Sequence, residues 1–302
     1  MDHRQLRALL AVGDHRSFSA AAKSLSTVQS NVSTHVARLE AELGVTLIDR
    51  ATTELTAEGR VVAERARRIE HEFQALASDV AALKDVVAGE VRIGMIGTTA
   101  RWLVPGFLTR LKERFPQVHV VILDATTSSL VPQLIGGQLD MAIVNTPVDA
   151  PELSSVALFD EERILVVPAD HQLADRSEVG LNDIAEHELL LAAKGTTFRI
   201  ELDEAAAAAG ATLMPKAEID GMRLLASLAF LGYGAAVLPA SAAPGTLAGP
   251  WRRVRISDLG TRTVALARRR RGLSTVAERA VAETLQEVVE AEVPGQPGLL
   301  LR

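Results

Sequence analysis

The feature that most constrains the fold is residues 57–88, a stretch without Gly or Pro after Gly59. Apolar residues recur in it with a seven-residue period in two registers: Val62, Ile69, Leu76 and Leu83, and Ala66, Phe73, Val80 and Val87. This seam over four heptads predicts a long helix that packs along a partner helix and so makes a homodimer. The alternative is an amphipathic helix that lies on its own domain, for which a wider apolar stripe is expected.

Residues 1–58 precede this stretch and predict three short helices followed by a wing-like loop. We expect the first helix over residues 6–12 and the second in "SFSAAAKSL", with Ser17 or Ser19 as its N-cap. The third helix is expected to have Thr27 as its N-cap and to end at Gly44, which suits a left-handed C-cap.

The third predicted helix has two faces of different chemistry. Val32, Val36 and Leu39 recur at helical spacing and form an apolar face that is expected to pack inwards. The opposite face carries short hydrogen-bonding side chains and a single charge: Gln29, Ser30, Asn31, Ser33, Thr34, His35 and Arg38. An ordinary solvated face would carry Lys and Glu, whereas these side chains suit the edges of base pairs. The alternative is a surface helix of a small bundle, because short polar residues also occupy caps and surfaces.

From residue 91 onwards, short apolar runs rich in Val and Ile alternate with segments of helical length. This alternation predicts an α/β domain whose strands are largely parallel and covered on both faces. The runs are "EVRIGMIG", "VHVVILDA", "LDMAIVN", "RILVVPA", "ELLLAAK", "GAAVLPA" and "TVALARR". "STVAERAVAETLQEVVEAE" predicts a further amphipathic helix, and "VPGQPGLLLR" after it is expected to be a loose tail.

The composition excludes several classes of protein. The chain has no Cys, which excludes a disulfide scaffold, thiolate catalysis and any Cys-based metal site. Aromatic residues make up 3% of the chain, too few for a stacking platform on single-stranded nucleic acid. No apolar stretch is long enough to span a bilayer, and charges interrupt the first apolar stretch, so we expect a cytoplasmic protein without a signal peptide or a membrane partner.

The net charge of -6 is unevenly distributed, with +1 over residues 1–70 and -7 over the remainder. The N-terminal part is therefore less acidic than the rest, but charge alone does not predict nucleic-acid binding. The run "RRRR" at 268–271 follows the strand-like "TVALA", so we interpret it as a solvated strand end.

The chain lacks the sequence motifs of common catalytic sites. It has no GxSxG motif, no Walker loop and no GxGxxG after a strand. The His residues are scattered and none has metal-ligand spacing. We therefore expect no catalytic residue, no metal site and no cofactor, and we predict that the chain is not an enzyme.

The segment "RSFSAAAKSLSTVQSNVSTHVARLEAELGVTLIDR" resembles the winged helix-turn-helix of LysR-type transcriptional regulators. "LTAEG" at 55–59 is similar to the start of that family's linker helix, and "LDMAIV", "ILVVPADHQLA" and "GYGAAVLP" follow in the family's order. Two departures stand out. Val28 precedes Gln29 where the family often has Ser or Thr, and the short wing "DRATTELT" keeps Arg50 but lacks a second Arg.

The resemblance implies a division of labour along the chain. Residues 1–58 would be a winged helix-turn-helix that binds double-stranded DNA, and residues 59–88 a linker helix that makes a homodimer, with a homotetramer as a dimer of dimers. The residues expected to contact DNA are Gln29, Ser30, Asn31, Ser33, Thr34, His35, Arg38 and Arg50. Ser33, Arg38 and Arg50 suit the phosphate backbone, and the others suit base edges. An activator of this family would also contact RNA polymerase.

Residues 90–302 resemble the family's effector domain, which is similar to type 2 periplasmic binding proteins. The resemblance implies lobe I at residues 90–162 and 266–302, lobe II at residues 163–265, and an effector between them near helix N-termini. The candidate effector-binding residues are Thr98, Thr99, Arg101, Thr127, Ser128, Asn145, Thr197, Phe198, Arg199, Asp220 and Met222. Arg101 and Arg199 are the candidate countercharges for a small organic acid. The same Thr and Ser residues suit helix N-caps, and the same Arg residues suit surface ion pairs.

We therefore predict a sequence-specific, DNA-binding transcriptional regulator whose activity is modulated by a small effector. The alternative is an α/β solute-binding protein or enzyme in which the N-terminal helices serve only as a dimerisation module.

Overall fold

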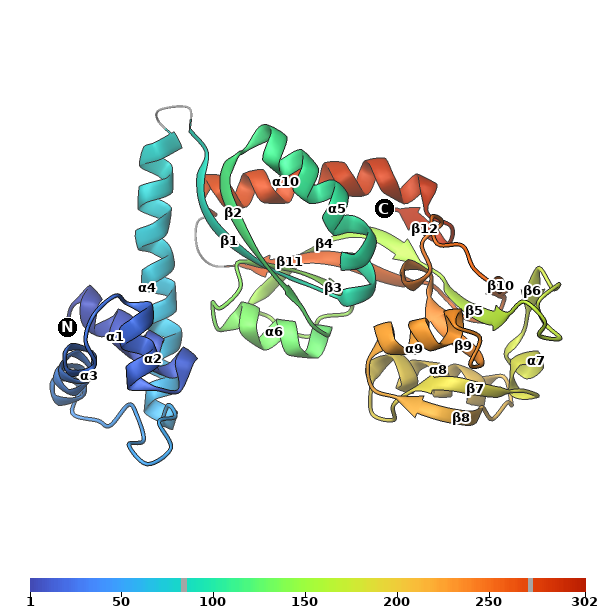
Figure 1. Cartoon of the computed structure of the whole chain (residues 1–302), viewed down its shortest axis with the longest axis horizontal. Coiled ribbons are helices and arrows are strands. Elements are labelled where there is room, and N and C mark those ends of the chain that lie inside the picture. The colour runs from blue at the N-terminus through green and yellow to red at the C-terminus, as the bar shows by residue number, and fades with distance from the viewer. Residues whose placement is uncertain (83–85, 271–273) are drawn as a thin grey trace.

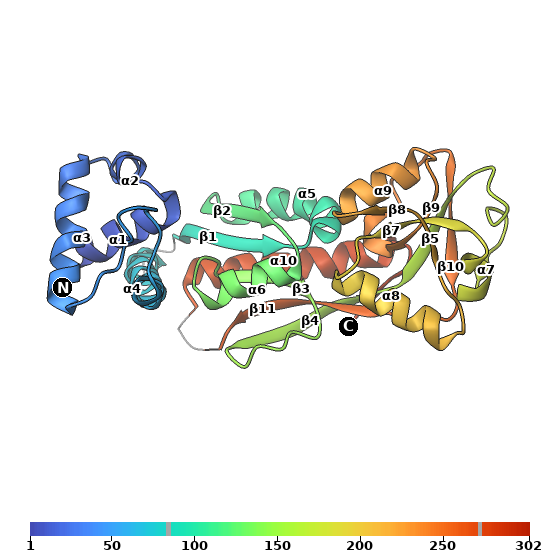
Figure 2. The same cartoon turned by 90° about the horizontal axis from the view of Figure 1, so that it is seen from below.

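The computed structural model describes residues 1–82, 86–270 and 274–302. A helical head, a long linker helix and two α/β lobes follow one another along the chain (Figures 1 and 2). The head and linker comprise α1 (His3–His15), α2 (Phe18–Ser24), α3 (Gln29–Leu43) and α4 (Ala57–Ala82). Among the described residues, no helix combines the length and hydropathy that a bilayer crossing requires.

Local hydrogen bonds define where the helices of the head begin and end. Asp2 and Gln5 form a capping box on α1, and the Ser17 hydroxyl accepts a hydrogen bond from the Ala20 amide at the start of α2, which confirms Ser17 as a cap. Gly44 ends α3 with φ 70°, as predicted. The prediction for Thr27 was wrong, because α3 begins one residue later and its N-cap, Val28, has no side chain that can accept a hydrogen bond.

The head has its own hydrophobic core. Val32, Val36 and Leu39 of α3 are fully buried against α1 and α2, as their helical spacing predicts. Ala63 and Ala66 of α4 belong to the same core, so the first turns of the linker helix are part of the head. This packing fixes the direction in which α4 leaves the head.

Further along α4, the predicted seam is exposed. Ile69 is 38% exposed, Phe73 51%, Leu76 65% and Val80 53%. The Phe73 ring lies 4.3 Å from the His3 ring of α1, but all four side chains remain more than a third exposed among the described residues. Exposed apolar side chains at this spacing suit a second copy of the helix.

The helix is shorter than the predicted linker of residues 59–88. It is described to Ala82, Leu83 lies outside the described residues, and Val87 precedes strand β1 without helical structure. Ala88 is already the first residue of β1, where it pairs with Gln117. Val87, the last predicted position of the seam, therefore does not belong to the helix.

Lobe I is built on a six-stranded sheet of order β12-β4-β11-β3-β1-β2. Its helices cover both faces, with α5 and α10 on one and α6 on the other (Figure 1). The elements are β1 (Ala88–Met95), α5 (Gly97–Arg114), β2 (Gln117–Asp124), α6 (Thr127–Ile135), β3 (Met141–Asn145), β4 (Leu153–Glu161), β11 (Arg262–Arg269), α10 (Val276–Glu292) and β12 (Leu299–Leu301), with a 3-10 turn at Val293–Gly295.

Lobe II is built on a second six-stranded sheet of order β6-β10-β5-β9-β7-β8. Its elements are β5 (Arg163–Pro168), β6 (Glu178–Val179), α7 (Leu181–Ala185), β7 (Glu188–Ala192), α8 (Thr197–Ala208), β8 (Met214–Ile219), α9 (Met222–Phe230), β9 (Ala235–Pro239) and β10 (Trp251–Ile256), with a 3-10 turn at Ala240–Ala242. Helix α9 packs on this sheet and also contacts α5 of lobe I.

Several expectations about the α/β domain were wrong. Both sheets are mixed rather than largely parallel, because β4, β11 and β12 in lobe I and β5 with its neighbours β9 and β10 in lobe II pair antiparallel. The supposed loose tail contains β12, whose backbone completes the edge of the sheet beside β4. The chain returns to lobe I at Arg262 rather than at residue 266, since β11 begins there.

The connection between the lobes is held by a buried ion pair. Glu161, which is 0% exposed at the end of β4, accepts a hydrogen bond from the Arg262 guanidinium at the start of β11, with 2.5 Å between Nε and Oε1. The other oxygen of Glu161 accepts the Ser241 amide of lobe II at 3.2 Å. The two strands that cross between the lobes are thereby fastened to each other and to lobe II.

The exposed seam of α4 generates the first prediction. Replacing Leu76 with Asp should leave the chain folded, because Leu76 is 65% exposed, but it should bury an unpaired carboxylate in the dimer. We expect the free energy of dimerisation to weaken by about 3 kcal/mol or more, measured by analytical ultracentrifugation. Arg65→Asp, on an exposed position outside the seam, is the control. An unaltered dimer in the Leu76 variant would contradict the assignment of the seam.

Candidate functional site

The outer face of α3 presents most of the predicted DNA-reading residues to solvent. Gln29, Ser30, Asn31, Thr34 and Arg38 are exposed. Ser33 and His35 are half-buried, and His35 Nδ1 is buried without a hydrogen-bond partner among the described residues. The structure therefore brings the first two turns together as one polar surface, with His35 at its inner edge.

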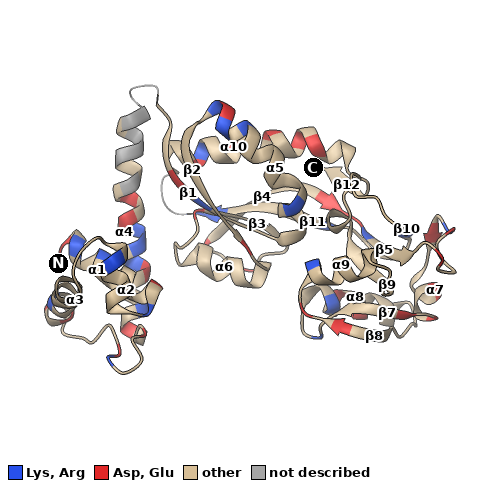
Figure 3. Ribbon diagram, in the orientation of Figure 1, with Lys and Arg blue, Asp and Glu red and all other residues tan. Residues whose placement is uncertain are grey.

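Local hydrogen bonds hold two of these side chains in place. The Asn31 amide donates to the Thr27 hydroxyl at 3.1 Å, and the Thr34 hydroxyl donates to the Ser30 carbonyl at 2.8 Å. Both side chains keep acceptor atoms free, and the Asn31 amide keeps a further donor. Lys and Arg are scattered over the head rather than gathered in one patch (Figure 3).

The N-terminus of α3 has no side-chain cap, because Val28 occupies the cap position and is 60% exposed. The first amide groups of a helix have no partner within the helix and carry its positive dipole end. An uncapped, exposed N-terminus of this kind suits a phosphate group.

Glu40 couples α3 to the wing. Its Oε1 accepts the amides of Leu47 at 2.8 Å and Ile48 at 3.1 Å, and its Oε2 accepts the Arg50 guanidinium at 2.7 Å. The wing itself is one antiparallel bridge between Ile48 and Leu55. Arg50 also lies over the Phe18 ring, so this predicted phosphate contact is held against the head.

At the lobe junction, where α5 of lobe I contacts α9 of lobe II, the first turn of α5 carries buried hydroxyl groups. Thr98 is 5% exposed and Thr99 is 0% exposed. Among the described residues, Thr99 Oγ1, Trp102 Nε1 and Asn145 Oδ1 are buried without a hydrogen-bond partner. Such groups cost free energy unless a water or ligand completes them. Thr127 has a structural role as well, because its Oγ1 accepts the Asn145 amide at 3.0 Å.

Two predicted effector residues of lobe II face its interior instead. Phe198 is 8% exposed and belongs to the lobe II core. The Arg199 guanidinium is 5% exposed and donates to Asp203, Glu218 and the Ala192 carbonyl. Because the first turn of α8 directs both side chains inwards, Arg199 is not the free countercharge that we expected.

The other predicted effector residues are spread over the surface around the junction. Arg101, Ser128, Thr197 and Asp220 are exposed. Met222 is half-buried at the start of α9 and packs against the cores of both lobes. Four of the predicted residues therefore belong to lobe I: Thr98, Thr99, Thr127 and Asn145. Met222 belongs to α9 of lobe II and packs against the cores of both lobes.

Sequence reasoning missed the ion pair that bridges the lobes. Arg223 of α9 lies 2.6 Å from Asp124 at the end of β2, as Nη1 to Oδ2. Gly97 makes room for the pair, since a Cβ there would lie 2.6 Å from Asp124 Oδ1 and 3.2 Å from Arg223 Cδ. "EIDGMR" contained the signal, because Arg223 directly follows Met222, but a single cation in a polar segment does not reveal its partner.

Family comparisons identify both parts of the molecule. The model described as "LysR substrate binding domain" matches residues 84–290, and the model described as "Bacterial regulatory helix-turn-helix protein, lysR family" matches residues 3–60. The chain belongs to the LysR family. It is a DNA-binding transcriptional regulator modulated by an effector, not an enzyme, which confirms the predicted function.

Two relatives are similar to this chain over most of its length. The chain is 33% identical over 241 residues to a probable hydrogen peroxide-inducible genes activator of Streptomyces viridosporus, covering 79% of this chain and 77% of the relative. It is 30% identical over 246 residues to the dual regulator OxyR of Escherichia coli K12, covering 81% of each chain.

Solved structures share the complete fold. A full-length cysteine-to-aspartate variant of OxyR from Pseudomonas aeruginosa matches with a TM-score of 0.76 and 24% identity, covering 96% of this chain and 95% of that chain. The regulator CbnR bound to its target DNA matches with a TM-score of 0.67 and 24% identity, covering 95% of this chain and all of that chain (100%).

The contacts of Glu40 generate the second prediction. Glu40→Ala removes the acceptor of two backbone amides, so we expect the free energy of unfolding of the head to fall by about 1–3 kcal/mol. DNA affinity at fixed salt should fall with it, because the wing loses its tie to α3. Chemical denaturation and a DNA-binding titration measure the two effects. Glu42→Ala on the same helix removes only an exposed ion pair with the N-terminal ammonium of Met1, so it should change both by little.

Proposed function

We propose that this regulator responds to a small carboxylate bound at the lobe junction and not to oxidation of a cysteine. The observation that carries the carboxylate ligand is the pair of buried donors on α5 that lack a partner among the described residues, Thr99 Oγ1 and Trp102 Nε1. The observation against cysteine oxidation is that the chain has no Cys. The relative from Streptomyces viridosporus is a probable hydrogen peroxide-inducible genes activator, and a matching OxyR structure is a cysteine variant. Reversible sensing of peroxide through a thiolate requires a cysteine that can reach the sulfenic acid or a disulfide. The relatives' signal therefore does not transfer to this chain by that route.

The chemistry of the junction favours an anionic ligand. In the first turns of α5, Thr99 Oγ1 and Trp102 Nε1 are buried donors that have no partner in the described part of the chain. The positive end of the α5 dipole lies in the same turn. A carboxylate supplies the acceptor oxygens that these donors lack.

Arg223 offers the ligand a countercharge that is already in place. In the described conformation the guanidinium is paired with Asp124 across the lobes. A ligand carboxylate that replaced Asp124 as the partner of Arg223 would exchange a contact between the lobes for a contact with the ligand. Such a ligand binds the two lobe arrangements with different affinity, which is the requirement for shifting their populations.

On the DNA side, we propose that the exposed polar surface of α3 enters the major groove. Gln29, Ser30, Asn31 and Thr34 would reach base edges, and Arg38 with the uncapped amides of α3 would contact phosphates. A dimer through α4 doubles this surface, so the operator would be an interrupted dyad. The protein would act in the cytoplasm, where its DNA is, and without a cofactor other than the effector.

A substitution at the start of α3 tests the DNA assignment. Gln29→Ala should reduce discrimination between the cognate operator and a variant operator by about 1–3 kcal/mol, because a bidentate contact to a base is lost. Its affinity for random duplex should stay close to that of the wild type. Competition titrations at one salt concentration measure both. Arg38→Ala is the matched comparison and should weaken cognate and random duplex alike.

A substitution at the junction tests the ligand assignment. Thr99→Val removes the unpartnered hydroxyl at nearly constant volume, so the ligand-free chain should become more stable by about 1 kcal/mol while its affinity for carboxylates falls. Thermal unfolding and a screen of small carboxylates by calorimetry measure the two effects. Thr109→Val is the control, because the Thr109 hydroxyl already donates to the Pro105 carbonyl. Altered DNA binding after peroxide treatment of the purified protein, without any ligand, would contradict the proposal.

A further inference from the structure

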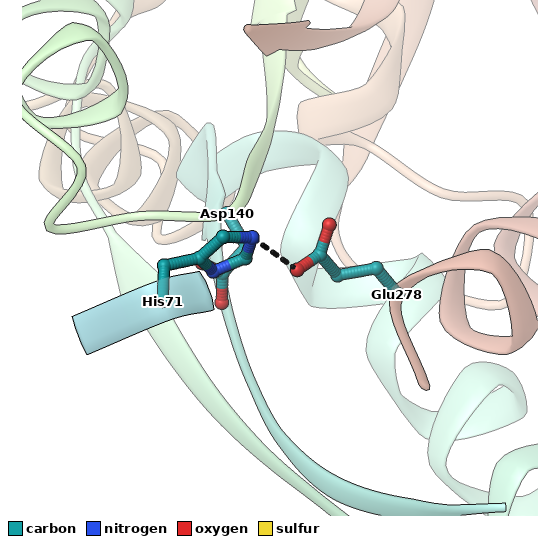
Figure 4. A group of neighbouring side chains, drawn as sticks. All are labelled: His71, Asp140 and Glu278. Carbon is teal, nitrogen blue, oxygen red and sulfur yellow. Dashed lines mark ion pairs between the residues drawn. The ribbon is translucent and has the colours of Figure 1, made fainter. Parts of the chain in front are cut away.

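A pocket of about 650 Å³ lies at the joint between the linker helix and lobe I, away from both sites described above. Residues of α4, of the turn before β3, of the end of β11 and of the start of α10 line it. Three of them form a cluster of metal-binding types on its wall: His71, Asp140 and Glu278 (Figure 4). One ligand atom from each lies within 4.8 Å of the others.

We propose that His71, Asp140 and Glu278 form a site for a divalent transition-metal ion that fastens α4 to lobe I. An imidazole nitrogen with two carboxylate oxygens, and no thiolate, is a donor set for borderline ions such as Zn²⁺. Three protein ligands also leave a coordination position for water.

One ligand atom from each residue lies within 4.8 Å of the others, but in the described conformation the imidazole turns a different nitrogen to each carboxylate. His71 Nε2 lies 3.2 Å from Glu278 Oε1, and His71 Nδ1 lies 3.5 Å from Asp140 Oδ1. Bond lengths of about 2.0–2.2 Å around tetrahedral Zn²⁺ separate neighbouring ligand atoms by about 3.3–3.5 Å. A turn of the His71 ring that directs one nitrogen at both carboxylates completes the set.

Burial takes these two carboxylates out of water, and five arginines also line the pocket: Arg67, Arg68, Arg268, Arg269 and Arg270. The side chains of His71, Asp140 and Glu278 are only 16%, 13% and 7% exposed. Burial, followed by the nearby charge of Asp140, raises the pKa of Glu278 to about 7, and burial also raises the pKa of Asp140. The pKa of Glu278 stays raised despite the neighbouring cations of Arg268 and Arg269, so these two do not fully compensate the carboxylates.

The surroundings supply outer contacts and access. Asp140 Oδ2 accepts the Arg92 amide at 2.7 Å, which orients the carboxylate and leaves Oδ1 towards His71. The Arg269 guanidinium donates to the carbonyls of Leu134 and Leu139, so it is held by the backbone and reaches Asp140 Oδ1 only at 3.9 Å. The pocket opens the cluster to solvent and gives an ion a route to it.

The position of the site gives it a consequence for DNA binding. His71 belongs to the linker helix that carries the head, whereas Asp140 and Glu278 belong to lobe I. A bound ion would replace the ion pairs of His71 with Asp140 and Glu278 by coordinate bonds across this joint. It would thereby restrict the angle between the head and the effector domain.

Calorimetric titration of Zn²⁺ into the full-length, chelator-treated protein tests the site. We expect a single ion per chain, an increase in melting temperature on binding, and X-ray absorption from nitrogen and oxygen ligands at about 2.0–2.2 Å. His71→Gln, Asp140→Asn and Glu278→Gln should each weaken affinity by about tenfold or more. Glu278→Gln keeps the volume of the side chain, and circular dichroism checks that each variant is folded.

Two control variants separate this cluster from other imidazoles. His119→Gln removes an exposed His of β2 and should leave Zn²⁺ affinity unchanged. His171→Gln removes one member of a pair whose rings, with His187, lie 4.7 Å apart in lobe II, and it should also leave affinity unchanged. Absence of Zn²⁺ binding to the wild type, or unchanged affinity in His71→Gln, would overturn the proposal, and loss of binding in His171→Gln would place the ion in lobe II instead.

Discussion

The packing of α4 against the head is the contact on which the rest of the molecule depends. Ala63 and Ala66 are small enough to bring the helix close to the core of the head, and both are almost completely buried there. One turn later the same helix turns apolar side chains to solvent, beginning with Ile69. A single rigid element thus orients the reading surface, offers the dimer seam and meets lobe I at His71.

This dual use of α4 explains why its apolar stripe is narrow. A helix buried only in its own domain needs a broad apolar face, and a coiled coil needs only the seam. In this chain Val62 and Ala66 lie against the head, while Phe73, Leu76 and Val80 continue the same seam in solvent. The sequence left open whether the helix packs on its own domain or along a partner helix. The first interpretation applies to the start of α4, and the second applies to the part from Ile69 onwards.

Patterns set by local chemistry could be read from the sequence. Gly44 at the end of α3, Ser17 at the start of α2 and the buried triplet Val32, Val36 and Leu39 follow from rules that act within one or two turns. The seven predicted apolar runs are strands for the same reason, since β-branched residues between helical segments favour a buried strand. Strand direction was not readable, because antiparallel pairing of β11 with β3 depends on where the chain returns.

What the sequence could not supply are contacts between distant segments. Arg199 of α8 looked like a free cation, yet Glu218 of strand β8 forms an ion pair with it. The run 268–271 does end strand β11, and Arg270 is exposed, whereas Arg271 lies outside the described residues. Arg269 is not solvated as expected, because its guanidinium is 15% exposed and donates to the carbonyls of Leu134 and Leu139. His71 stands between Glu70 and Glu72 in the sequence, yet the carboxylates that lie beside it in the cluster are Asp140 and Glu278, which reach it only through the fold.

The lobe junction and the joint at α4 lie at opposite ends of the same lobe. Strand β1 runs from one to the other. Near its start, the Arg92 amide donates to the Asp140 carboxylate of the joint, and at its end the strand leads into α5 of the lobe junction. A single hydrophobic cluster fills the space between, including Ile93 and Met95 of that strand. A ligand that rearranged the junction would act on the joint through this packed lobe. By linkage, an ion at the joint would then change ligand affinity by the same factor as the ligand changes ion affinity.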